Sequence, residues 1–413
     1  MELEEFTLLG IRAAVDGDGQ VYAEASGPLG RLLEEMVEYY SRSLNKQKVL
    51  AQREGGNVYT CYQPPVPSRA GFKVACNKLI ETVTGRHYPS TATISITKAC
   101  QCDCIHCSAA EFMRSGRRTV TREEMFSLID QAQKLGVNNM VFTGGEPLLH
   151  PHIDEYIRHV DYEEARPMLF TNGLGLTDER LEKLREAGLY SMMVSLDSVD
   201  PKQHDEWRRV PGCWQKAVDG AQHAREAGLL VGFSTYADPQ KVRRGELEEM
   251  LQLTRECKLH ELTIFDTVPT GRFLHLDKSR LLSEEDKEYI KEFSRRANQA
   301  EGLPGVKAQS FVNSADGHGC FAAYFQFYMT AAGDITPCDF TPLSFGNITE
   351  EPLRTIWERM TSHEAYRQRC GHCRMQDQEF RARYIDHIAE DTELPFPMYE
   401  RKESKDRAVV AAG

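Results

Sequence analysis

The chain has 413 residues, more than one simple hydrophobic core usually holds, so two or three domains are expected. An apolar content of 41% and a charged content of 27% are those of an ordinary globular protein. The net charge of −12 argues against nucleic acid or an anionic membrane surface as a partner. Because no apolar run reaches the length of a membrane span and the first residues are acidic, we expect a cytoplasmic protein.

Residues 1–89 are expected to form a separate α+β unit. The segment 6–25 alternates in polarity and turns at Asp16-Gly-Asp-Gly19, as a β-hairpin does. Helical spacing of apolar residues follows over 27–40, and Gln63-Pro-Pro-Val-Pro-Ser68 is typical of a stiff extended connector. No residue here carries evident chemistry. We therefore interpret the unit as a cap on the next domain, with substrate recognition as the alternative.

Strand and helix patterns alternate from residue 90 to about 270. The predicted strands are 91–97, 139–143, 168–171, 191–197, 230–236 and 262–267, and the predicted helices are 123–134, 152–159, 178–187, 214–227 and 246–256. Thr121-Arg-Glu-Glu124 is a capping box, and glycines stand where several of these helices should stop. Six βα units predict an α/β fold with a parallel sheet, either a partial barrel or an open doubly wound sheet. In both, ligands bind at the carboxyl ends of the strands.

Three thiols follow the first predicted strand at the spacing C-x3-C-x2-C, namely Cys100, Cys104 and Cys107. Three close thiolates can hold three corners of an iron–sulfur cube and leave one iron open to chelate a small molecule. Two alternatives stay open at this point. Cys102 and His106 lie inside the motif and would complete a zinc site, and a set of reduced structural thiols is the other alternative. Twelve cysteines without an export signal favour metal or redox chemistry over disulfides.

Polar and glycine-rich segments follow the next three predicted strands. They are Thr143-Gly-Gly-Glu-Pro147, Thr171-Asn-Gly173 and Ser195-Leu-Asp-Ser198. Adjacent glycines let the backbone approach a ligand closely. Each segment alone is ordinary turn chemistry, but together they stand at the same end of successive strands. They therefore predict one polar pocket beside the cysteine loop.

Four more cysteines follow in the last third of the chain. Before them we predict a helix at 284–298, with Ser283 as its N-cap, and a strand-like segment at 306–312. Two single thiols and a C-x2-C pair supply four ligands, enough to close a site completely, and zinc and iron–sulfur compete closely on chemistry alone. The four are Cys320, Cys338, Cys370 and Cys373. Further helices are expected at 353–360 and after the last of these thiols, and 401–413 is predicted to be a loose tail.

The C-x3-C-x2-C loop followed by Gly144-Gly-Glu-Pro147 resembles the radical S-adenosylmethionine (SAM) superfamily over residues 90–269. The resemblance implies a partial (β/α)6 TIM barrel, with a [4Fe–4S] cluster on Cys100, Cys104 and Cys107 that chelates SAM through its open iron. It also implies a SAM-binding set of residues. These are Gly144, Gly145 and Glu146 at the methionyl amine, Thr171, Asn172 and Ser195 near the ribose or carboxylate, and Arg208 at the carboxylate.

The assignment of Arg208 rests on Arg208-Arg-Val-Pro-Gly212-Cys-Trp214, which is similar to an Arg-Gly-x-x-Gly-Ser-Phe pattern of the family. A guanidinium fork suits a carboxylate, so a contact with SAM is chemically reasonable. Arg209, Cys213 and Trp214 depart from the pattern. Cys102 is interpreted as a bystander thiol, and the scattered cysteines 61, 76 and 257 as structural.

The C-terminal cysteines resemble the auxiliary-cluster extension called SPASM, or its shorter form, twitch. Cys320-x12-Gly333-x4-Cys338, then Gly346-Asn-Ile348, then Cys370-x2-Cys373 carry this resemblance. The full form has seven cysteines and two clusters, whereas four cysteines are visible here. One fully ligated auxiliary [4Fe–4S] cluster is therefore expected, as an electron acceptor or relay.

The resemblance implies an oxidoreductase in which one-electron reduction cleaves SAM, and the resulting 5′-deoxyadenosyl radical abstracts hydrogen from an organic substrate. A ribosomal peptide, a small alcohol or amino sugar, and a tetrapyrrole side chain stay open as substrates, and no catalytic side chain is assigned. A reductant such as flavodoxin or ferredoxin is the expected partner. The expected domains are a cap at 1–89, the barrel at 90–270, the auxiliary domain at 271–390 and a tail at 391–413. A zinc-stabilised scaffold is the non-catalytic alternative.

Overall fold

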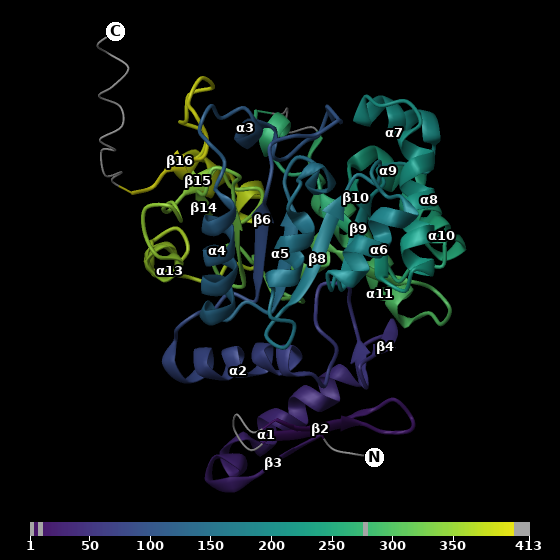
Figure 1. The fold of residues 1–413 in the computed structure, drawn as a ribbon, viewed down its shortest axis with the longest axis vertical. Helices are drawn as coiled ribbons and strands as arrows, with labels where there is room; N and C mark the ends of the chain where they lie inside the picture. Colours follow the sequence, from purple (N-terminus) through teal and green to yellow (C-terminus); the bar gives the residue numbers. More distant parts are fainter. Residues whose placement is uncertain (1–3, 7–10, 276–279, 400–413) are drawn as a thin grey trace.

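The computed structural model describes residues 4–6, 11–275 and 280–399. The N-terminal unit begins with a three-stranded antiparallel sheet of β1 (Glu4–Phe6), β2 (Ile11–Val15) and β3 (Val21–Ala25). The predicted hairpin is confirmed at β2–β3, where the Asp16 carboxylate accepts hydrogen bonds from the backbone N–H groups of Asp18 (3.0 Å) and Gln20 (2.8 Å). Helix α1 (Gly27–Leu44) follows, as predicted. The three-stranded sheet of this unit lies at the end of the molecule opposite the C-terminal segments (Figure 1).

Sequence analysis missed three elements of this unit. They are the short strands β4 (Ala51–Arg53) and β5 (Gly56–Val58) and the helix α2 (Arg69–Thr84). Ser68 ends the extended connector and caps α2, because its hydroxyl accepts the N–H of Gly71 at 3.0 Å. Helix α2 lies across the base of the central domain (Figure 1).

A nine-stranded sheet forms the central domain, and the α/β fold predicted from the sequence is confirmed. Its six middle strands are parallel neighbours in chain order: β6 (Thr91–Ser95), β7 (Asn139–Thr143), β8 (Arg166–Thr171), β9 (Ser191–Ser195), β10 (Leu230–Ala237) and β11 (Glu261–Asp266). At one edge β12 (Gly305–Ala308) pairs with β11. At the other, β13 (Gln326–Met329) pairs with β6 and then with β14 (Ile335–Thr336). The C-terminal third of the chain therefore extends the barrel sheet on both sides, across the domain boundary predicted at 270.

Helices connect successive strands and cover the outer face of the sheet (Figure 1). They are α3 (Ala110–Met113), α4 (Arg122–Leu135), α5 (Ile153–His159), α6 (Asp178–Glu186), α7 (Pro201–Arg208), α8 (Cys213–Glu226), α9 (Pro239–Arg244), α10 (Glu246–Glu256) and α11 (Glu284–Gln299). The capping boxes at Thr121 and Ser283 both form. All five helices predicted between the barrel strands begin and end within one residue of α4, α5, α6, α8 and α10. The short helices α3, α7 and α9 were not predicted.

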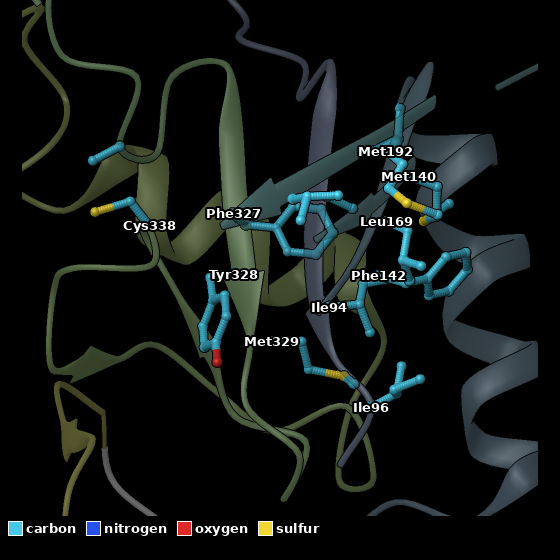
Figure 2. Close-up of a cluster of buried hydrophobic side chains, with 14 of the residues drawn as sticks. Ile94, Ile96, Met140, Phe142, Leu169, Met192, Phe327, Tyr328, Met329 and Cys338 are labelled. Carbon is cyan, nitrogen blue, oxygen red and sulfur yellow. The ribbon is translucent and has the colours of Figure 1, made fainter. Parts of the chain in front are cut away.

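The main hydrophobic core lies between the sheet and these helices. Figure 2 shows Ile94, Phe142 and Leu169 from neighbouring strands beside Phe327 from β13, and all four side chains are fully buried. Since parallel sheets are covered on their faces, their strands are apolar along most of their length. Burying each such side chain stabilises the fold by about 1.5–3 kcal/mol. Among the described residues, no helix combines the length and apolarity that a membrane crossing requires.

The strand predicted at 306–312 is only half correct. Strand β12 ends at Ala308, and α12 (Gln309–Val312) is a single helical turn. The side chains of Gln309 and Ser310 explain the change of direction. Gln309 Oε1 accepts the N–H of Asp266 at 3.0 Å, and Ser310 Oγ donates to the Asp266 carboxylate at 2.6 Å, so both hold the chain at the end of β11.

The remaining C-terminal elements are short. They are β15 (Leu343–Ser344), α13 (Leu353–Ser362), α14 (Gln378–Tyr384) and β16 (Phe396–Pro397). The predicted helices at 353–360 and after Cys373 are thus present. The tail predicted at 401–413 lies outside the described residues.

The N-terminal unit closes the barrel at the amino ends of its strands. The backbone N–H of Cys61 donates to the buried Glu261 carboxylate at 2.8 Å, and Ser191 Oγ donates to the carbonyl of Cys61 at 2.7 Å. Tyr62 places its hydroxyl 3.1 Å from Thr263 Oγ1 inside the barrel. These hydrogen bonds attach the N-terminal unit to β9 and β11 of the barrel.

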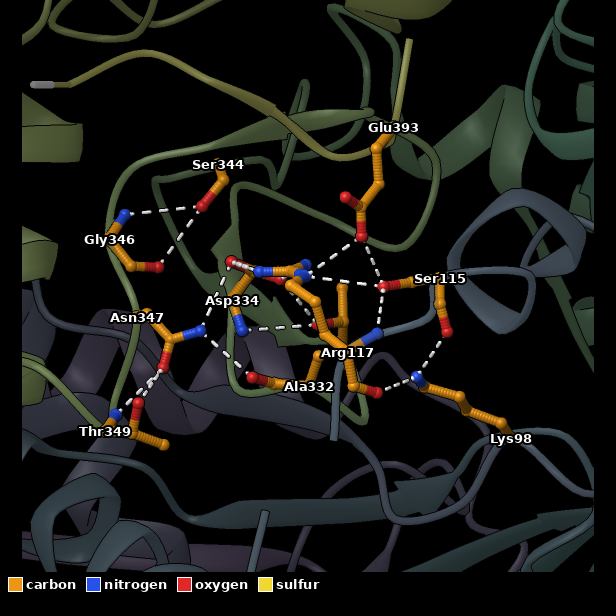
Figure 3. A network of polar contacts seen from close by, with 11 residues as sticks. Lys98, Ser115, Arg117, Ala332, Asp334, Ser344, Gly346, Asn347, Thr349 and Glu393 are labelled. Atoms are coloured by element: carbon orange, nitrogen blue, oxygen red, sulfur yellow. Dashed lines mark hydrogen bonds and ion pairs between the residues drawn. The ribbon is translucent and has the colours of Figure 1, made fainter. Parts of the chain in front are cut away.

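A polar network joins the segment after the cysteine loop to the C-terminal region (Figure 3). Lys98 Nζ donates to the carbonyl of Ser115 at 2.7 Å. Arg117 donates to the Asp334 carboxylate, with its Nη1 2.9 Å from Oδ1, and its Nε lies 3.2 Å from the Glu393 carboxylate. Asp334 is 0% exposed, so its charge depends on Arg117 for compensation.

Replacing Asp334 with alanine is expected to lower the free energy of unfolding by about 3 kcal/mol, because removal of one partner of a buried ion pair leaves the other uncompensated. The substitution also takes away the acceptor of Thr330 Oγ1. Denaturant unfolding of the purified protein measures the loss. Asp18→Ala, at an exposed turn of the β2–β3 hairpin, is the control and should change stability little. A loss below about 1 kcal/mol for Asp334→Ala would contradict this account.

His260 makes the stability depend on pH. Its imidazole is buried beside β11, and Nδ1 accepts the N–H of Val231 at 3.0 Å. Burial lowers the pKa of His260 to about 4. In the unfolded chain the group binds a proton near pH 6.5. The unfolded state therefore holds more protons between these values, and stability falls as the pH drops below about 6.5.

We expect the wild type to lose about 1 kcal/mol more stability than His260→Asn between pH 7 and pH 5.5. Asparagine is the matched variant because its side-chain oxygen can still accept the Val231 N–H without titrating. Urea unfolding curves at the two pH values measure the difference. Equal losses in the two proteins would show that His260 is not the group responsible.

Candidate active site

A cavity of about 1010 Å³ occupies the interior of the barrel and reaches the carboxyl ends of its strands. Both predicted thiol sets contribute to its wall. Cys100, Cys104 and Cys107 line it from the loop after β6, and Cys320, Cys338 and Cys373 line it from the C-terminal region. The pocket expected from the strand-end motifs is therefore present, and it reaches both cysteine sets.

Backbone contacts on several sides fix the cysteine loop. Ile105 N–H donates to the carbonyl of Trp207 at 3.0 Å, and Arg272 N–H donates to the carbonyl of Cys107 at 3.1 Å. Asp103 forms ion pairs with Arg209 and Arg272. The loop is thus held by residues after β9 and β11, in addition to its own strand.

The loop thiols differ in their readiness to ionise. A hydrogen bond from the Cys102 thiol lowers the pKa of Cys100 to about 6 and also lowers the pKa of Cys104. Burial raises the pKa of Cys107 to about 11, with the neighbouring Cys104 adding to the effect. Thiolates are the form that binds metal. Three grouped thiols on a fixed loop facing a cavity fit the iron–sulfur cluster predicted for this loop.

Gly144 and Gly145 lie directly against that loop. Gly145 N–H donates to the carbonyl of Thr97 at 2.8 Å, and a Cβ on Gly145 would lie 2.2 Å from the carbonyl oxygen of Ala99. Gly144 has φ +149°, which side chains of L residues rarely adopt. The glycine pair is required by this close backbone approach, and both residues also line the cavity.

The Glu146 carboxylate accepts most of its hydrogen bonds from other residues of the chain. It is 0% exposed and accepts hydrogen bonds from Thr171 Oγ1 (2.7 Å), Asn172 N–H (2.7 Å) and Leu148 N–H (3.1 Å). Burial raises its pKa to about 7. A carboxylate has about four acceptor positions, so at most one is left for a ligand. The structure gives Glu146 a role that sequence reasoning missed, which is to join the ends of β7 and β8.

The other predicted SAM contacts lie at the ends of β8 and β9, and they differ in whether their polar groups already bond within the chain. Thr171 is committed to Glu146, and Asn172 Nδ2 donates to Gln101 Oε1 at 3.2 Å and to the Cys102 sulfur at 3.4 Å. The Asn172 side chain therefore links the end of β8 to the cysteine loop. Ser195 lines the cavity, and its hydroxyl has no hydrogen-bond partner among the described residues.

Arg208 belongs to a buried charge cluster around Asp197, which is 2% exposed. Arg208 Nε donates to Asp197 Oδ2 at 2.6 Å, and His106 Nε2 lies 3.3 Å from the same oxygen. Burial alone would raise the pKa of Asp197, but the adjacent Arg208 and His106 hold it well below its usual range. Arg208 also lines the cavity, and among the described residues its two terminal nitrogens bond to no other side chain. They remain available for an anion.

Two residues of the predicted motifs prove to have roles that sequence reasoning did not assign. His106 stacks on Tyr236 with ring centroids 4.5 Å apart, in addition to facing Asp197. Cys102 is not a bystander, because it packs with Cys104 and Cys213 in one buried cluster at the loop. Cys213 begins α8, and nothing in the local sequence places it beside the loop thiols.

The four C-terminal thiols come together from three separate segments. Cys320 N–H donates to the carbonyl of Cys370 at 2.8 Å, and Cys338 Sγ lies 3.2 Å from Thr341 Oγ1. Gln309 Nε2 lies 4.0 Å from the Cys373 sulfur. Burial raises the pKa of Cys320 and of Cys373, and raises that of Cys338 to about 12. Four neighbouring thiols, three of them buried and Cys370 half-buried, fit a fully ligated cluster.

The zinc alternative requires side chains that are arranged around a single metal ion. Within residues 4–6, 11–275 and 280–399, no three His, Cys, Asp or Glu side chains have the arrangement of a single-ion site. Of the three scattered cysteines predicted to be structural, Cys61 and Cys257 are buried among apolar residues, whereas Cys76 is half-buried.

Comparison with protein families identifies the class. Residues 94–254 match the Radical SAM superfamily, and residues 320–377 match SPASM, described as an iron-sulfur cluster-binding domain. The chain belongs to the radical SAM enzymes that carry a SPASM domain, as the resemblance in the sequence implied. The cofactors of this class are SAM, the [4Fe–4S] cluster that binds it, and auxiliary [4Fe–4S] clusters.

The chain is also similar to individual proteins and to solved structures. The chain is 28% identical over 311 residues to the AdoMet-dependent heme synthase of Methanosarcina barkeri, covering 69% of this chain and 88% of that protein. It is 25% identical over 291 residues to the PqqA peptide cyclase of Rhizobium meliloti, covering 68% and 76%. The crystal structure of Streptococcus suis SuiB bound to S-adenosylmethionine superposes with a TM-score of 0.53 at 17% identity, covering 68% and 69% of the two chains. That structural likeness shows the shared fold.

Proposed function

We propose that this radical SAM enzyme oxidises a tetrapyrrole side chain held in the central cavity. Cys100, Cys104 and Cys107 would hold the SAM-binding cluster, and a single auxiliary cluster would lie on Cys320, Cys338, Cys370 and Cys373. When bound, the first cluster and SAM supply one-electron reduction and a hydrogen-abstracting radical. The observation that carries the proposal is that both thiol sets reach one cavity of about 1010 Å³.

The chain's own residues would bind and orient SAM beside the loop. Arg208 lines the cavity, and its terminal nitrogens would suit the SAM carboxylate, while the Ser195 hydroxyl, without a partner among the described residues, would suit the ribose. The backbone of Gly144 and Gly145 would face the methionyl amine. Glu146 would act by holding the ends of β7 and β8 in register and by offering at most one acceptor position. A substrate that fills the cavity would keep water from the reacting atoms.

The choice of substrate class rests on the relatives and the cavity. Three of the most similar relatives are heme synthases, and a fourth is an Fe-coproporphyrin III synthase. The cavity volume is at the upper end of the range for small-molecule pockets, which is about 300–1,000 Å³. A flat macrocycle needs a large pocket with aromatic walls, and half-buried aromatic rings line this one.

An anaerobic turnover experiment tests the proposal. The protein, reconstituted with iron and sulfide, should hold about eight irons per chain and release 5′-deoxyadenosine on reduction with dithionite. Incubation with iron coproporphyrin III should yield a tetrapyrrole of lower mass, detected by mass spectrometry. Release of 5′-deoxyadenosine without change in any tetrapyrrole would reject this substrate class and leave the radical SAM activity intact.

A peptide is the second candidate substrate, and one observation favours it. Strand β3 forms an edge of the N-terminal sheet and pairs only with β2 among the described residues. An edge strand can accept an added peptide strand, here beyond Val21, whose backbone N–H and carbonyl already pair with the Asn45 side chain. The similarity to PqqA peptide cyclase points the same way. Turnover of candidate peptides in the same assay, with loss of activity when residues 1–25 are deleted, would favour this alternative.

We further propose the physiological setting. A flavodoxin or ferredoxin would supply single electrons, and the cytoplasm would keep the ligand thiols reduced. The proposed domain organisation is a cap at 1–89, the barrel at 90–270, an auxiliary-cluster domain at 271–390 and the tail at 391–413. The auxiliary cluster would accept or relay the electron that leaves the substrate.

A further inference from the structure

The cavity contains a cation that the proposed chemistry does not use. Lys307 lies on β12, in register with Thr263 of β11, and its side chain lines the cavity. Its Nζ lies 3.5 Å from the centre of the Tyr62 ring. Among the described residues, this ring contact is the one direct interaction that the ammonium makes, with no hydrogen bond or ion pair.

The nearest carboxylate does not pair with this ammonium. Glu261 influences Lys307 through space, but its two oxygens accept hydrogen bonds from the Cys61 N–H (2.8 Å) and from Thr263 Oγ1 (3.2 Å). Burial lowers the pKa of Lys307, as expected for a cation away from bulk water. The half-buried ammonium therefore has no hydrogen-bond acceptor and no carboxylate partner among the described residues. An anion in the cavity would satisfy it.

Four aromatic rings connect Lys307 to both thiol regions. Tyr62 and Phe170 have centroids 6.0 Å apart, Phe170 and Phe265 6.2 Å, and Phe265 and Phe340 6.1 Å. All four rings are half-buried and line the cavity. We call this series the aromatic wall.

The aromatic wall spans the space in which the chemistry is proposed to occur. Phe170 immediately precedes Thr171 at the end of β8, and Phe340 stands two residues after Cys338. Lys307 lies on β12, two residues before Gln309, which is the first residue of α12 and whose side chain contacts Cys373.

We propose that Lys307 forms a carboxylate-binding subsite at the inner end of the aromatic wall. The ligand is the substrate itself, a molecule with a flat or apolar body and a peripheral carboxylate. Its body lies on the four rings and its carboxylate reaches the ammonium, so its opposite edge faces the cysteine loop. This inference rests on the proposed function, because a tetrapyrrole with propionate side chains has these features.

Binding of 1-pyrenebutyrate and of its uncharged methyl ester to the anaerobically reconstituted protein tests the subsite independently of turnover. Pyrene fluorescence reports both affinities. A charge-assisted hydrogen bond contributes about 1.5–3 kcal/mol, so the wild type should bind the acid at least about tenfold more tightly than the ester. Lys307→Met should abolish that preference and leave ester binding unchanged, while Lys307→Arg should retain most of it.

Two results would overturn the subsite: equal affinity of the wild type for acid and ester, or a preference in Lys307→Met equal to that of the wild type. Lys202→Met, an exposed lysine on α7, is the matched control and should behave as the wild type. The melting temperature of Lys307→Met reports whether the variant folds correctly. If tetrapyrroles are not converted but the acid preference is intact, the proposed substrate is wrong and the subsite stands.

Discussion

Replacing Cys104 with alanine is expected to abolish 5′-deoxyadenosine release under dithionite and to lower the iron content of the reconstituted protein by about half. Cys104 is buried between Cys100 and Cys107 on a loop held by backbone contacts to Trp207 and Arg272. The loop offers three thiolates at the open-corner site, and two ligands do not hold a cube of four irons. Iron analysis and chromatography of the reaction products measure both effects.

Two further variants make this result specific. Cys373→Ala should also lower the iron content by about half, but 5′-deoxyadenosine release without substrate should persist, because the loop thiols are unchanged. Cys257→Ala, a buried thiol on the outer side of the barrel, should keep both the iron and the activity. If Cys104→Ala still releases 5′-deoxyadenosine, the assignment of the loop as the SAM-binding cluster site is wrong.

Replacing Asp197 with alanine is expected to lower the free energy of unfolding by about 3–5 kcal/mol and to weaken SAM binding. The substitution leaves the buried Arg208 guanidinium without its anion, since Arg208 Nε donates to Asp197 at 2.6 Å. His106 loses the same partner. Without that anchor, Arg208 no longer presents its terminal nitrogens to the cavity in one orientation.

Denaturant unfolding and equilibrium dialysis with labelled SAM measure the two effects of Asp197→Ala. Asp197→Asn keeps the shape and one acceptor but removes the charge, so we expect an intermediate loss in both measurements. Asp219→Ala, at an exposed position of α8, is the control and should change neither. If a correctly folded Asp197→Ala protein binds SAM with normal affinity, the proposed role of Arg208 in SAM binding is wrong.

The polar networks suggest how the two cysteine sets keep a fixed separation. Arg117 and Asp334 connect the segment after the cysteine loop to the turn beside β14 (Figure 3). Strand β13 pairs directly with β6, which carries the loop. Both contacts join the first cysteine set to the C-terminal region through rigid elements. Such a connection would hold a substrate between the two sets in one geometry.

Local chemistry accounts for what the sequence predicted well. Six strands and five helices of the barrel were located within a few residues, because apolar periodicity, capping boxes and glycine stops act over a few neighbouring positions. The motif at Gly144-Gly-Glu-Pro147 was assigned to the pocket for a sound reason, since carboxyl ends of parallel strands meet at one edge. The thiol spacing alone placed three ligands on one loop.

Site details that depend on several strands at once were predicted less well. The sequence implied that Glu146 contacts SAM, whereas its carboxylate mainly receives donors from residues 148, 171 and 172. Cys213 was treated as a departure from a pattern, although it packs against Cys102. In both cases the partner is distant in sequence, so no local rule indicates the contact.

By itself, the sequence determined the βα order, the position of the cysteine loop and the class of chemistry, because these follow from spacing along one segment. Only the tertiary structure decided that β12 and β13 complete the sheet and that Tyr62, Phe170, Phe265 and Phe340 form one wall ending at Lys307. Pairing of short strands and meeting of side chains across a barrel depend on contacts between distant segments. Their energies arise from burial and register, which short stretches of sequence do not specify.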